Sequence, residues 1–264
     1  MKKPTADSAP RYPVKSAGNA LRLLLLLHDR QVVRVSDASV ALGVAPSTAH
    51  RLLGMLQHHG FAQQAPASRA YVAGPALLAL AVSAARRTEL REQGRPHLTR
   101  LMEETGETAH LAVLDGRRVL FLDSIESPHA LRVASRSGTS SWAHCTSVGK
   151  ALLAELPDDR VLDLYSDQLM PGLTDRSITA TTELLAALRE VRQQGYAVNR
   201  GESEQGVGSV GAVVHDRLGR AVAALSAAAP LVRLTKSRLP QIIAAIRGTA
   251  LALGADLGGE LAGR

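Results

Sequence analysis

The sequence predicts an α+β protein in which a small N-terminal domain of helices and one β-hairpin precedes a larger domain built on a mostly antiparallel sheet. Helical patterns joined by a short glycine turn lie within the first 75 residues. Beyond them, strand patterns come in hairpin pairs with helical patterns between the pairs, which is typical of helices packed on an antiparallel sheet. A length of 264 residues is enough for two domains with separate cores.

Residues 45–61 carry the helical pattern on which the N-terminal prediction depends. Pro46 favours a first helical turn, and Gly60 is suited to end the helix in the left-handed region. An apolar stripe is formed at i, i+3, i+4 and i+7 by Ala49, Leu52, Leu53 and Leu56. The polar side chains that lie off this stripe are Ser47, Thr48, His50, Arg51 and Gln57.

A shorter helix is predicted over residues 36–42, and Gly43-Val44-Ala45 supplies a tight connection to the helix that follows. The pair has the pattern of a helix-turn-helix, whose second helix presents its N-terminal residues to a DNA major groove. Upstream, Ser16 is expected to cap a helix over residues 17–28. Residues 1–14, rich in proline and poor in apolar side chains, are expected to form a disordered arm.

Residues 61–72 read as a strand, a turn and a strand, which together form a hairpin wing with Arg69 at its tip. An Ala/Leu-rich helix is then predicted over residues 76–87. Its apolar surface is too wide for a lone exposed helix, which favours self-association with a second copy. The composition turns charged over residues 89–94, where we place the domain boundary.

The positive charge of the chain is confined to its N-terminal part. Residues 1–90 hold 11 Lys and Arg and 4 Asp and Glu, whereas the remainder holds 20 of each, so the whole net charge of +7 lies beside the helix-turn-helix. This asymmetry indicates DNA, because neutralising phosphates releases counterions, although a basic tail without function is the alternative. The candidate DNA-binding residues are Arg34, Ser47, Thr48, His50, Arg51 and Arg69.

The second domain is predicted element by element from its periodicity and its turn residues. Asp115-Gly116 is a strong hairpin signal, and Gly195 is placed to end a long amphipathic helix. Pro240 is expected either in the first turn of the closing helix or at a kink. The predicted helices are 95–105, 147–156, 160–165 capped by Asp158, 181–194 and 235–253, and the predicted strands are 108–114, 118–124, 131–134, 207–215 and 221–228.

Composition also indicates where the protein works. The single cysteine, Cys145, excludes an internal disulfide framework and suits a reducing cytoplasm. The longest apolar runs, 23–27 and 76–82, fall far short of the ~20 residues of a membrane span. No apolar segment of a secretion signal follows Lys2 and Lys3, so we expect a cytoplasmic protein.

Two glycine-rich matches fail on their context. Residues 206–211 match G-x-G-x-x-G, but a polar loop precedes them and a β-branched strand follows, so we reject a dinucleotide site. Residues 148–151 resemble the end of a phosphate loop, yet Ala143 replaces the first glycine and Ala151 the magnesium-binding hydroxyl. The nine histidines show no zinc spacing, and no cofactor or metal is expected.

Taken together and in this order, the motifs resemble those of the IclR family of transcriptional regulators. The resemblance runs from about residue 15 to residue 257. It is carried by STAHRLL at 47–53, YVAG at 71–74, AHCTSVGKALLA at 143–154, the segment from Gly195-Tyr196-Ala197 through Glu202 to Gly206-Val207, and AALS at 223–226.

The resemblance implies a winged-helix DNA-binding domain at 15–75, a linker helix that dimerises at 76–92 and a GAF-like effector-binding domain at 93–258. It also implies homodimers or homotetramers on double-stranded operator DNA. The implied ligand is a small effector, commonly a carboxylate or an aromatic acid, held over the sheet.

By position, the resemblance assigns the effector's backbone contacts to Ser147 and Val148, where amides at a helix start favour an anion. It assigns polar side chains to Asn199 and Ser209, and a wall to Ala130, Val133 and Ser141. Trp142 is expected either to cover the pocket or to pack beneath a loop.

Some residues depart from the family pattern. Asn199 stands where many relatives have Asp, Gly201 where an acidic residue is common, and Val213 where Pro is frequent. Ser140-Ser141-Trp142 replaces a segment that usually ends in Pro.

Two alternatives come from other functional classes. One is a small-molecule enzyme that uses Cys145 and His144, although adjacent residues on a turn seldom point at each other. The other is a sensor-scaffold that binds a partner protein through the helix at 76–87.

Overall fold

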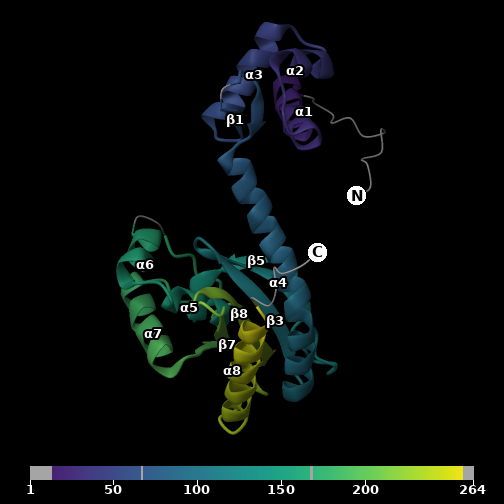
Figure 1. Ribbon diagram of the computed structural model, residues 1–264. Coiled ribbons are helices and arrows are strands. Elements are labelled where there is room, and N and C mark those ends of the chain that lie inside the picture. Colours follow the sequence, from purple (N-terminus) through teal and green to yellow (C-terminus); the bar gives the residue numbers. More distant parts are fainter. Residues whose placement is uncertain (1–13, 67, 167–168, 258–264) are drawn as a thin grey trace. The chain divides into compact units, whose positions relative to one another are not determined.

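The computed structural model describes residues 14–66, 68–166 and 169–257. Two compact units make up the chain, and the division between them falls at Arg86 and Arg87, inside one helix (Figure 1). The predicted disordered arm, 1–14, lies outside the described residues except for Val14. No helix in the described part of the chain is long and apolar enough to cross a membrane, and no group of three acidic, histidine or cysteine side chains there could hold a metal ion.

The first unit is a helix-turn-helix with a short hairpin. Its elements are α1 (Lys15–Arg30), α2 (Val35–Leu42), α3 (Pro46–His58), β1 (Ala62–Gln64) and β2 (Tyr71–Ala73). The core contains the predicted stripe of α3, since Ala49 and Leu53 are fully buried against Leu23 and Leu27 of α1. The predicted helices and the hairpin are therefore confirmed.

The ends of the N-terminal helices follow local chemistry. Gly43 closes α2 with a φ of 65°, a conformation that glycine adopts without steric cost, and so turns the chain toward α3. At the start of α2, the carboxylate of Asp37 accepts the backbone N–H of Arg34 at 2.9 Å. The prediction that Ser16 caps α1 is wrong, because the helix begins at Lys15 and Val14 occupies the cap without a side-chain hydrogen bond.

A single helix, α4 (Pro75–Thr105), replaces the two helices predicted at 76–87 and 95–105. The charged stretch 89–94, where the domain boundary was predicted, lies inside the continuous helix, as do Gly94 and Pro96. Gly94 is buried, and a Cβ there would approach Leu111 Cδ2 to 2.6 Å, so the glycine serves close packing rather than helix termination. Pro96 is exposed, where its missing N–H is more readily tolerated.

The second unit is built on a six-stranded, fully antiparallel sheet in the order β5-β4-β3-β8-β7-β6. Its strands are β3 (Thr108–Asp115), β4 (Arg118–Ile125), β5 (Ser140–Trp142), β6 (Ala197–Arg200), β7 (Val207–His215) and β8 (Ala221–Pro230). The predicted hairpins at 108–124 and 207–228 and the antiparallel sheet are confirmed.

Two edge strands differ from the prediction. Residues 131–134 form no strand; Val133 is instead buried in a loop, where its carbonyl accepts the Thr108 hydroxyl at 2.6 Å. The strand beside β4 is β5, which lies later in the chain. At the other edge, β6 was not predicted, since four residues after the Gly195 turn are too few for a clear alternation.

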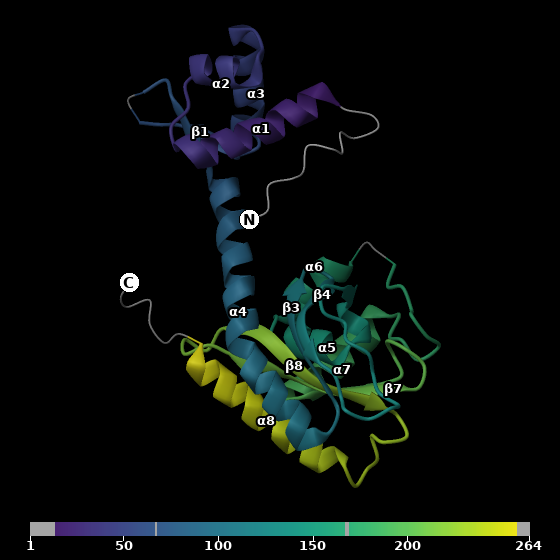
Figure 2. The ribbon, with the colours of Figure 1, turned by 90° about the vertical axis from the view of Figure 1, so that its right-hand side faces the viewer.

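Helices cover both faces of this sheet (Figure 2). The C-terminal half of α4 and α8 (Leu239–Asp256) pack on one face through Leu98, Leu101 and Ile246. Pro240 lies in the first turn of α8, as one of the two predicted placements requires. The other face is covered by α5 (Ser147–Ala154), α6 (Asp158–Tyr165) and α7 (Thr181–Gln194), with the 3-10 turn η1 (Ala143–Cys145) before α5.

Asp158 begins α6 and does not cap it, contrary to the prediction, because Pro157 occupies the N-cap position. The Asp158 carboxylate binds Arg192 at 2.7 Å and Arg189 at 3.1 Å, and both arginines belong to α7. These hydrogen bonds hold the pKa of Asp158 below its ordinary value. The residue thus ties α6 to α7.

All eight residues of α5 are buried, which requires the helix to lie very close to its neighbours. A Cβ at Gly211 of β7 would stand 2.7 Å from the Ser147 carbonyl carbon, and one at Gly149 would stand 2.1 Å from the Ala143 oxygen. Lys150 is also buried, and its ammonium donates to the Val198 carbonyl at 2.7 Å and to the Glu202 carboxylate. Lys150, which belongs to the segment that resembled a phosphate loop, therefore forms a structural ion pair with Glu202.

Close packing at a glycine also occurs between α8 and β7, and two glycines of α8 allow a matched test of its effect on stability. A Cβ at Gly254 would lie 2.2 Å from the His215 backbone oxygen, whereas one at Gly248 would meet nothing within 4 Å. We expect Gly254→Ala to lower the free energy of unfolding by about 1–3 kcal/mol through overpacking. Gly248→Ala should raise it by up to about 1 kcal/mol through helix propensity. Urea unfolding of both variants checks this, and equal effects would contradict it.

Candidate functional site

The N-terminal half of α3 presents polar side chains that its core does not use. Ser47, Thr48, His50 and Arg51 are all exposed, whereas Ala49 between them is fully buried. None of the four makes a side-chain hydrogen bond or ion pair to another described residue. The first turns of α3 therefore carry a free cation and several free hydrogen-bonding groups on one surface.

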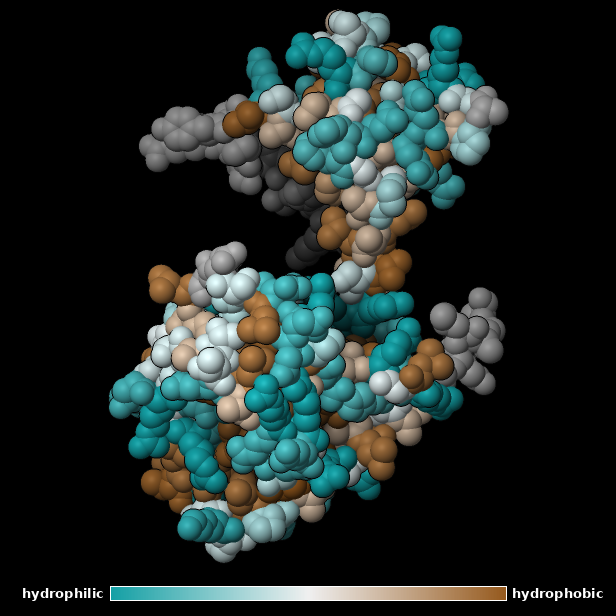
Figure 3. Space-filling model, turned by 90° about the vertical axis from the view of Figure 1, so that its left-hand side faces the viewer, coloured by the Kyte–Doolittle hydropathy of each residue, from teal (hydrophilic) through white to brown (hydrophobic). Residues whose placement is uncertain are grey.

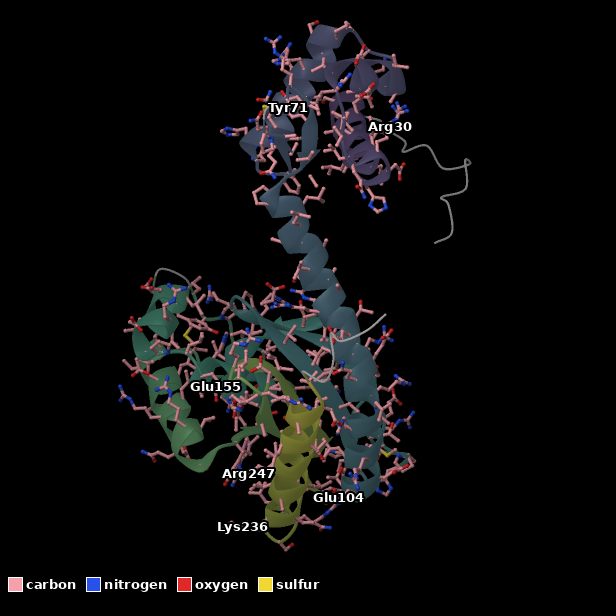
Figure 4. The ribbon with its side chains drawn as sticks, in the orientation of Figure 1. Arg30, Tyr71, Glu104, Glu155, Lys236 and Arg247 are labelled. Carbon is pink, nitrogen blue, oxygen red and sulfur yellow. The ribbon has the colours of Figure 1, made fainter. Side chains whose placement is uncertain are left out.

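Arg34 and Arg69 are also exposed, and their guanidinium groups pair with no other described residue. Arg22 differs, because its guanidinium donates to the Ala41 carbonyl at 2.6 Å and so holds α1 against α2. Arg69 lies in the turn of the hairpin, whose base is fixed by Tyr71 (labelled in Figure 4). Tyr71 is buried, and its backbone exchanges two 2.8 Å hydrogen bonds with Val33.

The second unit contains an inner cavity between its sheet and the start of α5. The cavity has a volume of about 20 Å³, roughly one water position. It adjoins an outer cavity of about 550 Å³, with which it shares Phe121, Val133, Arg136, Ser203 and Val207. The full lining of the inner cavity is His110, Phe121, Val133, Arg136, Thr146, Ser147, Val148, Asn199, Ser203, Val207, Ser209, Ser226 and Ala228.

Strand register assembles the floor of the inner cavity from distant parts of the chain. His110 on β3 lies opposite Ser226 on β8, and Ser226 lies opposite Gly211 on β7. In the neighbouring row, Ser209 on β7 pairs with Asn199 on β6. The floor is thus a polar patch within a sheet face that is otherwise packed with apolar side chains.

The first turn of α5 faces this floor with two unpaired amides. The Thr146 side chain accepts the Gly149 N–H at 3.0 Å, and the Thr146 carbonyl accepts that of Lys150 at 2.9 Å. The N–H groups of Ser147 and Val148 have no acceptor among the described residues. Since both residues line the cavity, the positive end of the helix dipole is available to a ligand.

Asn199 lines the cavity, but all of its hydrogen-bonding capacity is used by the protein. Its Oδ1 accepts the backbone N–H of Gly201 and of Glu202, both at 2.9 Å. Its Nδ2 donates to the Cys145 carbonyl and to Ser203 Oγ, both at 3.0 Å. An amide has two acceptor and two donor positions, so Asn199 holds the 201–203 loop in place.

Ser209 differs from Asn199, because it keeps some hydrogen-bonding capacity. The hydroxyl groups of Ser147 and Ser209 lie 2.7 Å apart, and one donates to the other. This pair leaves one hydroxyl proton free for another acceptor.

Arg136 supplies the cation at the boundary between the two cavities. Its guanidinium binds the Glu204 carboxylate at 2.9 Å and lies 5.9 Å from the centre of the Phe121 ring. Glu204 is 63% exposed, and a solvated ion pair of this kind contributes at most about 1 kcal/mol. Arg136 can therefore exchange Glu204 for another anion.

His110 is buried in the floor, and neither of its ring nitrogens has a hydrogen-bond partner of ordinary distance and angle among the described residues. Burial lowers its pKa to about 4, and the charge of Arg136 adds to this shift. A weak hydrogen-bonding contact with the backbone of Ala134 and the charge of the Glu126 carboxylate raise the pKa in part. At neutral pH the ring is therefore uncharged, with one nitrogen that donates and one that accepts.

Three residues assigned by resemblance lie away from the inner cavity. Ala130 is exposed and lines neither cavity, and Ser141 lines only the outer one. Trp142 lines neither cavity, and the guanidinium groups of Arg117 and Arg118 lie over its ring at 5.4 and 4.6 Å. This geometry disagrees with the expectation that Trp142 covers the pocket.

The prediction missed the other residues that line the inner cavity, namely His110, Phe121, Arg136, Thr146, Ser203, Val207, Ser226 and Ala228. The polar residues inside strands offered one signal: His110 and Ser226 interrupt runs of apolar side chains at positions whose neighbours are buried. Their proximity depends on the β3–β8 pairing, across more than one hundred residues of sequence, which no local pattern specifies.

His144 and Cys145 do not form a nucleophilic pair. His144 Nε2 donates to the Pro171 carbonyl at 3.1 Å, and Cys145 Sγ lies 3.8 Å from the same oxygen. Burial raises the pKa of the Cys145 thiol, whereas an activated cysteine has a lowered pKa. Among the described residues, no imidazole or carboxylate accepts a hydrogen bond from this thiol.

A further hollow of about 470 Å³ lies between α5, α7, β7 and α8. Two of its charged side chains, Glu155 and Arg247, are labelled in Figure 4. Glu155 already pairs with His215 at 2.9 Å, and Arg192 binds Asp158 and two backbone carbonyls. This hollow therefore offers a ligand fewer free polar groups than the inner cavity does.

Comparison with known proteins gives matches to both units. Residues 16–66 match the family described as the IclR helix-turn-helix domain, and residues 82–255 match the bacterial transcriptional regulator IclR C-terminal family. The chain is 33% identical to the HTH-type transcriptional regulator BhcR of Paracoccus denitrificans, over 86% of this chain and 81% of that protein. It is 31% identical to the regulator XynR of Escherichia coli, over 93% and 98%.

Solved structures agree with these matches. An IclR-type regulator from Silicibacter superposes with a TM-score of 0.64 at 30% identity, covering 93% of this chain and 97% of the other. An IclR homologue from Microbacterium hydrocarbonoxydans, complexed with 4-hydroxybenzoate, superposes with a TM-score of 0.61 at 25% identity, covering 93% and 100%.

The buried His110 predicts how the second unit responds to acid. Its folded pKa of about 4 lies below the ordinary value of 6.5, so between these pH values the unfolded chain binds a proton that the folded chain does not. Stability should fall as the pH drops from 6.5 to 4, by up to about 3 kcal/mol from this residue. His144, whose pKa burial also lowers, acts in the same direction.

The measurement is urea unfolding at several pH values, followed by the fluorescence of the only tryptophan, Trp142, which belongs to the second unit. His110→Gln should lose distinctly less stability than the wild type over this range. Parallel pH profiles for the two proteins would show that His110 is not the titrating group.

Proposed function

Because this chain belongs to the IclR family of bacterial transcriptional regulators, we propose that it binds operator DNA through α3 and the hairpin, and that a small acid bound in the second unit modulates this binding. The observation that carries the first part is the unpaired polar surface of α3. Ser47, Thr48, His50 and Arg51 project from a helix whose opposite face is core, as a major-groove helix requires.

The other two predicted DNA contacts, Arg69 and Arg34, lie in the same unit as α3. Arg69, in the turn of the hairpin, is suited to contact a phosphate or the minor groove, and Arg34 is suited to contact a phosphate. Neither is bound by another described side chain. The confinement of the +7 charge to residues 1–90 supports a polyanionic partner.

Self-association is part of the proposal. Leu78, Leu80 and Val82, in the first turns of α4, are each more than half exposed, and Figure 3 shows apolar side chains gathered on this segment. A second copy of the chain would remove this surface from water. Two copies would also place two α3 helices on two half-sites of DNA. We therefore expect a homodimer or a homotetramer on operator DNA.

The second part of the proposal concerns the inner cavity. The amides of Ser147 and Val148 and the guanidinium of Arg136 are donors suited to a carboxylate. The Microbacterium relative that is complexed with 4-hydroxybenzoate supports an acidic ligand. We place the acid group of the effector at the opening of the inner cavity, over the β3–β8–β7 floor and beside Val133 and Ser209, and the rest of the ligand in the adjoining outer cavity of about 550 Å³.

The DNA assignment predicts the behaviour of one substitution and its control. Arg51→Ala should weaken binding to the specific operator by about tenfold or more, because a good arginine-to-guanine pair contributes ~1–3 kcal/mol. Arg30→Ala removes the same charge from the last turn of α1, outside α3, and should weaken binding far less. Fluorescence anisotropy over a salt titration, with unfolding curves of both variants, provides the measurement. Equal losses would refute the assignment of Arg51.

The proposed effector site predicts that Arg136, and not Arg132, is needed for the binding of a small carboxylate. A small carboxylate that binds the folded state should raise the melting temperature by mass action. Arg136→Gln should weaken that binding by about tenfold or more, because a charge-assisted hydrogen bond is lost. Arg132→Gln is the control, since Arg132 binds Glu126 and lines only the outer cavity. Calorimetry that finds Arg136→Gln unimpaired would contradict this site.

A further inference from the structure

One edge of the six-stranded sheet is only partly covered. The outer strand β6 begins at Ala197, opposite Gly211, whereas β7 continues to His215. By register Gly195 would stand opposite Val213, but it ends α7 in the left-handed region with a φ of 76°. Among the described residues, no strand therefore lies beside β7 on this side beyond Gly211.

The register also shows that the backbone of Val213 points to this open edge. The Leu231 N–H donates to the Gly206 carbonyl at 2.7 Å, which makes Val207 and Pro230 a pair without mutual hydrogen bonds in the β7–β8 ladder. Such pairs alternate with hydrogen-bonded pairs, and the ladder is regular up to residue 214, so Val213 forms no hydrogen bond with its partner on β8. No other backbone hydrogen bond reaches Val213 among the described residues. Its N–H and C=O are therefore a donor and an acceptor without partners.

The hollow of about 470 Å³ between α5, α7, β7 and α8 lies along this edge. Val213 packs toward the α5 and α7 layer, and Ala212 packs toward α8. A strand added beside β7 would point alternate side chains into the same two layers. The side chains of Arg192, Tyr196 and Arg247 line the hollow around the edge, which is therefore recessed and suits a single extended chain.

Arg247, labelled in Figure 4, supplies a free positive charge on the α8 wall of this hollow. Its guanidinium forms no ion pair or hydrogen bond with another described residue, and a Cβ at Gly195 would lie 3.9 Å from it. With Lys236 and Tyr196, Arg247 also lines a neighbouring groove of about 610 Å³ beside α8. An acidic side chain beside the edge strand is the complement of this charge.

We propose that β7 receives, at Val213, an extended segment of a partner protein, which adds a strand to the sheet and places an acidic side chain on Arg247. The central residue of the segment exchanges two main-chain hydrogen bonds with Val213, and its small apolar side chain packs toward α5 and α7. The residues before and after it point toward α8, and at least one of them is aspartate or glutamate. In strand addition, main-chain hydrogen bonds provide affinity and alternate side chains provide specificity.

Two further observations favour this occupant. A second copy of the chain would have to bring two recessed edges together across the side chains that surround each of them, whereas one extended segment fits between those side chains. The family resemblance gives proline as frequent at position 213, and proline would lack the N–H that strand addition uses. Val213 supplies that donor. The inference is independent of the operator and effector sites.

The test uses the full-length protein and labelled pentapeptides with blocked ends. One panel is Thr-Glu-X-Glu-Thr, in which X is Ala, Val or Leu, and the matched panel is Thr-Lys-X-Lys-Thr. Fluorescence anisotropy should show saturable binding of at least one acidic peptide, and about tenfold weaker binding of its basic counterpart. Methylation of the backbone nitrogen of X should weaken binding by about tenfold or more, because it removes a main-chain hydrogen bond. Methylation of the next nitrogen, which points away from β7, should have little effect.

Variants of the protein test the same contacts. Val213→Pro should weaken peptide binding by about tenfold or more and leave urea unfolding nearly unchanged, because the N–H that it removes has no partner. Arg247→Gln should remove the preference for the acidic panel. Arg100→Gln is the matched control, since Arg100 is an exposed arginine of α4 outside the hollow, and it should retain that preference. If Val213→Pro does not fold, the methylated peptides still test the main-chain contact.

Hydrogen exchange measured by NMR tests the edge itself. In the free protein the Val213 amide should exchange faster than those of Ala212 and Val214, and the bound peptide should protect it. Protection before any peptide is added would show that the chain itself or a second copy already covers the edge, and would overturn the inference. Failure of every peptide to bind, equal binding of the two panels, or full binding of the peptide methylated at X would also overturn it.

Discussion

The second unit depends on the close approach of α5 to the sheet at Gly211. Because no side chain stands there, the backbone of Ser147 and Val148 rests on β7, and the whole helix is buried. This contact brings Lys150 into the interior, where Glu202 and the Val198 carbonyl must neutralise and bind it. It also turns the first amides of α5 toward the polar row of the sheet. The absence of a side chain at Gly211 thus allows both the burial of α5 and the position of its first amides beside the inner cavity.

Residue 199 shows how the cavity wall is held. Its side chain bonds the loop that carries Ser203, and Nδ2 donates to the Cys145 carbonyl directly before α5. An aspartate at this position could accept the two loop amides but could not donate to that carbonyl. Compared with the aspartate that the family resemblance implies at this position, Asn199 therefore holds the wall by different hydrogen bonds, whereas the proposed ligand contacts fall to other residues.

The sequence predicted the features that are set within a few residues of each other. Gly43, Pro46 and Gly60 mark the turn and the ends of α3, and Asp115-Gly116 marks a hairpin, because helix ends and tight turns have local causes. The continuity of α4 was missed because the charged stretch 89–94 resembles a domain boundary, and only the packing of Leu111 against Gly94 explains the glycine. His110 and Ser226 meet through strand pairing alone, which a single sequence does not reveal.

The polar residues of the cavity fall into two groups. Asn199 and Thr146 are occupied in fastening the walls, whereas His110, Arg136 and one proton of the Ser147–Ser209 pair are unoccupied or readily exchanged. Substitutions at the unoccupied residues should therefore be tolerated better by the fold than substitutions at Asn199 and Thr146. A laboratory that wishes to redirect this regulator toward a new inducer, for use as a biosensor, can randomise the unoccupied positions and leave the fastening residues untouched.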